Sequence, residues 1–187
     1  MPRARRRRSG RVALAAVFAL AALGWTMNRV RIYHRAQQLL PAAVETSGMQ
    51  RFAMSPGQLQ CMLFGLLLRC ESHGAVVLEL SDQSAAAIGR QGLAYFEGAT
   101  TSRGALSRRG PAHYDPWRRS PLPEAWSRTE TGSGLWPGVA HVDVGAGMRR
   151  RLSTAWRDGA YYTRTTTGRA WLVVLPDERL VVYSWWD

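Results

Sequence analysis

An uncharged run of 17 residues, 12–28, lies between two groups of arginines near the start of the chain, and it constrains the fold more than any other feature. As a helix that rises 1.5 Å per residue, the run is roughly 25 Å long, close to the thickness of the hydrocarbon core of a bilayer. Trp25 lies near its far end, where an indole is favourable at a membrane interface. The run therefore predicts a transmembrane signal-anchor helix whose partner is the lipid bilayer.

The arginines around this run predict its orientation. Six precede it and three follow it, and residues 1–35 contain no acidic side chain. They are Arg3, Arg5, Arg6, Arg7, Arg8 and Arg11 before the run, and Arg29, Arg31 and Arg35 after it. By the positive-inside rule, the basic segment 1–11 lies in the cytoplasm and the body lies outside the cytoplasmic (inner) membrane.

Two other interpretations of this leader stay open. Small residues in 19–21 and 22–24 suit signal-peptide cleavage, which would make the mature chain periplasmic or secreted. Alternatively, the leader is a basic tail that precedes a buried helix of a cytosolic protein.

The charge of the chain is concentrated in the leader. The net charge is +12 and all 25 basic side chains are arginines, nine of them in residues 1–35. The remaining residues carry 16 arginines against 13 acids, so no nucleic-acid partner is expected. The absence of lysine excludes a P-loop lysine, a Schiff-base lysine and a serine–lysine dyad. No cofactor is predicted.

The rest of the chain predicts a small α+β domain. Residues 29–57 are expected to form a juxtamembrane helix, ended or kinked at Pro41, and a linker. The extracytoplasmic domain is then 58–187. It should contain a strand at 75–80, and a helix that Ser81 caps and that runs from 82 to about 96.

A C-terminal antiparallel β-meander is the clearest fold prediction. Its strands are expected at 161–165, 170–175 and 179–186. Alternation along the middle strand places Trp171, Val173 and Leu175 on one face, and the residues between them on the other.

Two cysteines leave segment 55–70 with two interpretations. The apolar spacing and the Ser55-Pro56 start indicate an amphipathic helix. On one helix, Cys61 and Cys70 would be too far apart for a disulfide, which a secreted chain favours. The alternative is a hairpin turning at Gly65, with the two cysteines bridged.

A turn-rich stretch, 98–140, holds the best candidates for partner binding, because arginines there accompany aromatic residues. The candidates are Tyr114, Trp117, Arg118, Arg119, Trp126 and Trp136. The alternative is that the aromatic side chains hold a packed irregular loop against the sheet. The apolar strand at the C-terminus likewise suits either core packing or pairing with another chain at a sheet edge.

Two histidines are each followed two residues later by an acid. His113 with Asp115, and His141 with Asp143, would share a strand face and are weak candidates for metal ligands. No catalytic motif is present, and no catalytic residue is predicted. Five carboxylates, at Glu71, Glu79, Glu97, Glu124 and Asp143, leave a glycan hydrolase open.

The basic leader, the apolar helix that continues into an amphipathic one, and the β-meander are together similar to the plan of type IV pilin-like proteins. The resemblance covers mainly residues 5–40, with Gly10 at the position of the processing site. Arg11 stands where that family has Phe or Met, and Ala15 where it has glutamate. The resemblance implies a minor pilin-like subunit, and no functional residue is carried over.

We therefore expect a membrane-anchored bacterial envelope protein whose extracytoplasmic domain binds a partner protein in a secretion, pilus or cell-wall assembly. The alternatives are a periplasmic or secreted hydrolase of cell-wall glycan, a periplasmic inhibitor or immunity protein, and the pilin-like subunit. An enzymatic role is not favoured.

Overall fold

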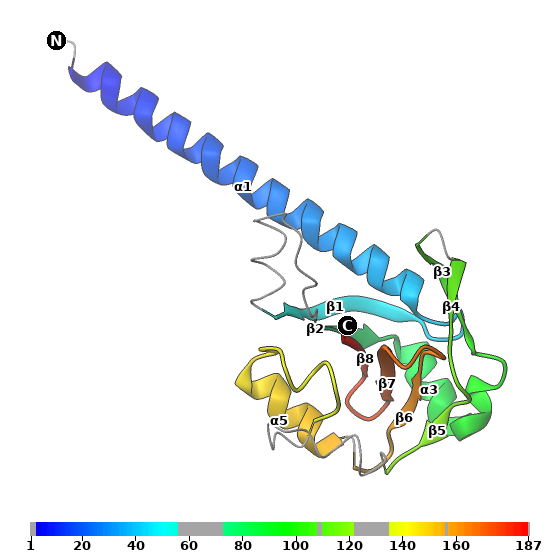
Figure 1. Ribbon diagram of the computed structural model, residues 1–187. Helices are drawn as coiled ribbons and strands as arrows, with labels where there is room; N and C mark the ends of the chain where they lie inside the picture. The colour runs from blue at the N-terminus through cyan, green and yellow to red at the C-terminus, as the bar shows by residue number, and fades with distance from the viewer. Residues whose placement is uncertain (1–2, 56–72, 108–109, 122–134, 156, 187) are drawn as a thin grey trace. The chain divides into compact units, whose positions relative to one another are not determined.

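The computed structural model describes residues 3–55, 73–107, 110–121, 135–155 and 157–186 (Figure 1). The chain is α+β, with an N-terminal helix and an antiparallel sheet that includes the C-terminal strand. It divides into two compact units, Met1–Arg35 and Ala36–Asp187. The α+β class expected from the sequence is confirmed.

Helix α1 (Arg3–Leu39) is 37 residues long and accounts for the first unit. Alanine, leucine and arginine, which dominate its sequence, are among the strongest helix formers. The helix ends two residues before Pro41. This end is the predicted one, because proline lacks an N–H and its ring clashes with the preceding turn.

The apolar side chains of α1 are exposed. The large ones are Leu14, Val17, Phe18, Leu20, Leu23, Trp25, Met27 and Val30. Within the described part of the chain, no helix has the combination of length and mean hydropathy that crossing a bilayer needs.

Arg103 makes several contacts with the segment that follows α1, which belongs to the second unit. The backbone N–H of Arg103 donates to the Leu40 carbonyl over 2.8 Å. Its guanidinium donates to the carbonyls of Ala42, at 3.1 Å, and Val44, at 2.6 Å. Leu40 and Val44 are fully buried, so these two side chains are part of the core.

Six strands form one antiparallel sheet in the order β1-β2-β8-β7-β6-β5. The strands are β1 (Thr46–Met54), β2 (His73–Leu80), β5 (Arg118–Arg119), β6 (Tyr161–Arg164), β7 (Ala170–Leu175) and β8 (Leu180–Trp186). The C-terminal strand β8 is central, between β2 and β7 (Figure 1). Of the two uses expected for that strand, core packing is therefore the one observed.

The predicted meander is confirmed as β6, β7 and β8. Every residue of β7 is buried, which means that both faces of the sheet are covered. Trp171, Val173 and Leu175 pack with helix α5 (Ala146–Ala155) and the segment 135–144. On the opposite face, Tyr161 contacts the ring of Phe96 at 5.1 Å between centroids.

The sheet begins earlier in the sequence than expected. The second compact unit starts at Ala36, and β1, which precedes residue 58, pairs with β2 along its whole length. Pairing through backbone groups needs no apolar side chain, and β1 contains one buried residue, Ala53. The strand has two irregularities of register and little apolar burial, so its sequence lacks the alternating hydrophobicity by which a strand is predicted.

The helix after β2 begins as predicted and ends differently. The Ser81 hydroxyl caps α3 (Asp82–Gln91) by accepting from the Ser84 N–H at 3.1 Å. Gly92, with φ of +59°, ends the α-helix, and the chain continues as the 3₁₀ helix η1 (Gly92–Phe96). Glycine adopts positive φ at no steric cost, which accounts for the change.

The turn-rich stretch contains regular structure that its composition conceals. Strands β3 (Thr101–Ser107) and β4 (Gly110–His113) form a two-stranded sheet, and β5 adds an edge to the main one. Helix α5 was likewise not expected. It buries only Leu152 completely, too little to produce a clear apolar stripe.

Cys61 and Cys70, with the helix and hairpin interpretations of 55–70, lie outside the described residues.

Candidate functional site

The tyrosine of the predicted partner-binding set is buried. The Tyr114 side chain is 3% exposed, and its hydroxyl donates to the Leu39 carbonyl at the end of α1. Burial raises the pKa of Tyr114, and the nearby Tyr183 raises it further. Burial also raises the pKa of Tyr183 to about 12. Both phenols therefore stay neutral in an apolar layer, where they are not accessible to a partner.

Trp117 has a similar structural position. Its indole N–H donates to the Ala99 carbonyl at 2.7 Å, and its ring stacks on Phe96 with centroids 4.2 Å apart. A buried Trp with its N–H satisfied contributes packing area without a polar cost. The interpretation in which this tryptophan holds the loop against the sheet therefore fits the structure.

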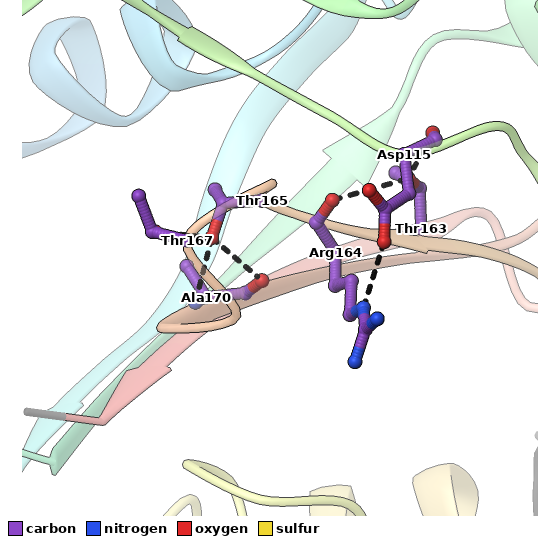
Figure 2. A network of polar contacts seen from close by, with 6 residues as sticks. All are labelled: Asp115, Thr163, Arg164, Thr165, Thr167 and Ala170. Carbon is purple, nitrogen blue, oxygen red and sulfur yellow. Dashed lines mark hydrogen bonds and ion pairs between the residues drawn. The ribbon is translucent and has the colours of Figure 1, made fainter.

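Asp115, one of the weak metal candidates, belongs to a polar network beside β6 (Figure 2). Its carboxylate accepts from Arg164 Nε at 2.7 Å, and its carbonyl accepts from the Thr163 hydroxyl at 2.6 Å. The backbone N–H of Asp115 donates to the Arg164 carbonyl at 2.9 Å. These contacts join the loop to the strand.

The same network closes the turn between β6 and β7. The Thr165 hydroxyl accepts from the Ala170 N–H at 3.1 Å and lies 3.1 Å from the Thr167 hydroxyl (Figure 2). Thr165 also forms an isolated bridge with Tyr114. The network is structural, since its buried members bond to backbone groups.

Trp136 is the most enclosed of the predicted binding residues that the structure describes. It is 1% exposed, and its indole N–H donates to the Ser184 hydroxyl at 3.2 Å. That hydroxyl in turn donates to the Pro137 carbonyl at 3.1 Å. Gly138 makes this close approach possible, because a Cβ there would lie 2.8 Å from the Ser184 Cβ. Trp126 lies outside the described residues.

Arg118 and Arg119 remain as the exposed members of the set. They form the short edge strand β5, which pairs with Tyr162 and Tyr161 of β6. Among its described members, the predicted set thus divides into three buried aromatic side chains and two exposed arginines. The exposed pair is the candidate contact surface.

The two predicted His–Asp pairs do not form a joint site. His113 Nδ1 lies 3.5 Å from the Thr101 hydroxyl, whereas the Asp143 carboxylate accepts from the Gly145 N–H at 2.8 Å. The strand assumed for 141–143 is a turn and coil segment, so the alternation of a strand does not apply. In the described ranges, no three His, Cys, Asp or Glu side chains gather as metal ligands.

His141 instead faces a residue that the sequence did not suggest. Its ring centroid lies 4.9 Å from that of His73, with 32° between the ring planes. His73 begins β2, and His141 lies in the segment that covers the sheet. No local pattern relates two residues so far apart in sequence, and only the fold places them together.

Comparison with known proteins places this chain in no family. No family model matches it, and neither does any curated protein or solved structure.

Proposed function

We propose that the chain is a single-pass bacterial envelope protein, anchored by residues 12–28 in the cytoplasmic membrane. In this proposal its second unit lies outside that membrane and binds a partner protein of a secretion, pilus or cell-wall assembly. The observation that carries the anchor is the distribution of exposed apolar side chains around α1.

These side chains surround the helix and do not form a stripe. At about 100° per residue, Leu20, Leu23 and Trp25 point about 240°, 180° and 20° from Leu14. Each of the four is more than half exposed. A protein partner covers one face of such a helix, whereas lipid covers every face. An all-round apolar surface therefore favours a bilayer.

The residues at the far end of the run suit a membrane interface. The guanidinium of Arg29 lies over the Trp25 ring, 5.4 Å from its centroid. An indole and an arginine extending toward water are typical anchors at that depth. A run of roughly 25 Å is short, and local thinning of the bilayer with extension of the flanking arginines accommodates such a mismatch.

The orientation follows from the charges. Six arginines before the run and three after it favour retention of the N-terminus in the cytoplasm. The body, with 16 arginines against 13 acids, carries little net charge that would oppose export.

Partner binding is supported by what the second unit exposes. Arg118 and Arg119 are both exposed on an edge strand, at successive positions whose side chains leave opposite faces of the sheet, and arginine is enriched in protein interfaces. The described His and Asp candidates have structural partners, and no observation favours the hydrolase. We accordingly propose an acidic surface of a membrane-associated protein as the partner.

Reporter fusions test the anchor and its orientation. Alkaline phosphatase fused after Asp187 should be active, because this enzyme folds only outside the cytoplasm. Green fluorescent protein fused at the same position should not fluoresce, because it does not fold after it is exported in an unfolded state. The chain should also remain in the membrane pellet after extraction at pH 11. A fluorescent green fluorescent protein fusion together with an inactive alkaline phosphatase fusion would reject the orientation. Full release of the chain from the membrane at pH 11 would reject the anchor.

Charge reversal tests the contact surface. We expect Arg119→Glu to lower the amount of cross-linked adduct in native membranes by about tenfold, since one lost interfacial contact is worth about 1.4 kcal/mol. Arg150→Glu is the matched control, because Arg150 is also an exposed arginine and lies on α5. Equal adduct yields from both variants would remove β5 from the proposed interface.

A further inference from the structure

Two histidines from distant parts of the second unit lie ring to ring at the surface. His73 is half-buried at the start of β2, where it pairs with Trp186 of β8, and His141 is exposed. His141 is also held in place, because its neighbours Ala140 and Val142 are 7% and 3% exposed. The pair is therefore carried by packed backbone on both sides and is open to solvent on one.

We propose that His73 and His141 together bind one divalent transition-metal ion, with water in the remaining positions. A Zn–N bond of about 2.1 Å puts an imidazole centroid roughly 3.2 Å from the metal. Two centroids 4.9 Å apart then subtend an angle of roughly 100° at the metal, near the tetrahedral value of about 109°. The centroid spacing thus matches two ligands of one ion, as it also matches two rings packed against each other, and the experiment below distinguishes the two arrangements.

The ligand type defines the class of metal. Neutral imidazole suits Zn²⁺, Ni²⁺ and Cu²⁺, and for a given site Cu²⁺ binds most tightly of the three. Among the described residues no third His, Cys, Asp or Glu completes the group. The site is therefore an open one, which leaves positions for water or for a side chain of another molecule. This proposal concerns the second unit alone and does not depend on the membrane anchor.

The test uses the full chain in detergent micelles, purified without a histidine tag. Zn²⁺ binding is measured by calorimetry, and Cu²⁺ is examined by electron paramagnetic resonance, in which coordinated nitrogens split the signal. We expect one ion per chain and two imidazole nitrogens at Cu²⁺.

His141→Asn is the informative variant, because His141 is exposed and its replacement leaves the core intact. It should raise the Zn²⁺ dissociation constant at least tenfold and leave one nitrogen at Cu²⁺. His113→Asn is the matched control: it also leaves three of the four histidines and should change neither result. A double variant, His73→Asn with His141→Asn, should show no one-to-one binding, and circular dichroism should verify that each variant is folded.

Equal Zn²⁺ affinities for the wild type and His141→Asn would overturn the proposal. The two rings would then pack against each other without binding a metal ion. A loss of affinity in His113→Asn as large as that in His141→Asn would overturn it as well.

Discussion

Leu20→Arg is expected to release most of the chain from the membrane. Leu20 is the central residue of the run 12–28 and is 69% exposed on α1. Arginine at the centre of a membrane helix costs about 2.5–3.5 kcal/mol, whereas leucine contributes about −0.5 kcal/mol. The difference of about 3–4 kcal/mol corresponds to a factor of roughly 10²–10³ in insertion. Fractionation followed by alkaline extraction measures it.

Leu93→Arg provides the control for that experiment. Leu93 is also an exposed leucine, at 45%, but it lies in η1 of the second unit. The same substitution there should leave the chain in the membrane pellet, because η1 lies outside the proposed anchor. If Leu20→Arg and Leu93→Arg partition alike, residues 12–28 do not anchor the chain in lipid.

Trp136→Ala is expected to have the largest effect on folding. The side chain is 1% exposed in the cluster between the sheet, α5 and the segment 135–144. Removing a buried Trp costs about 3–5 kcal/mol, mainly through lost burial and the cavity left behind. The Ser184 hydroxyl keeps its bond to the Pro137 carbonyl, so the lost hydrogen bond adds little. Urea unfolding of the full chain in detergent, followed by near-ultraviolet circular dichroism, measures the change in the free energy of unfolding.

Trp186→Ala makes the same substitution at a position that is 44% exposed. Its cost should be about 1 kcal/mol, because the ring is almost half exposed and its tilted contact with Trp171, at 5.4 Å between centroids, is of the kind that contributes about that much. A smaller loss for Trp136→Ala than for Trp186→Ala would contradict the assignment of Trp136 to the core. It would return Trp136 to the candidates for partner binding.

Composition alone does not show which tryptophans of the turn-rich stretch are buried. Trp117 and Trp136 stand among prolines, glycines and arginines, as binding residues in loops often do. Their burial depends on strands β6 to β8, which supply the surface they cover. For the same reason, β1 and α5 were missed: their own side chains bury little, and their places come from backbone pairing and from the sheet beneath them.

What the sequence determined by itself is local. Backbone and side-chain preferences of neighbouring residues are sufficient to end α1 before Pro41, to cap α3 at Ser81 and to alternate the residues of β7. Tertiary structure alone decided the central place of β8, the burial of the tryptophans and the meeting of His73 with His141. These depend on contacts between residues far apart in the chain, and the packing of the whole core selects which of them pair. Neither segment carries a periodic sequence pattern that identifies its partner.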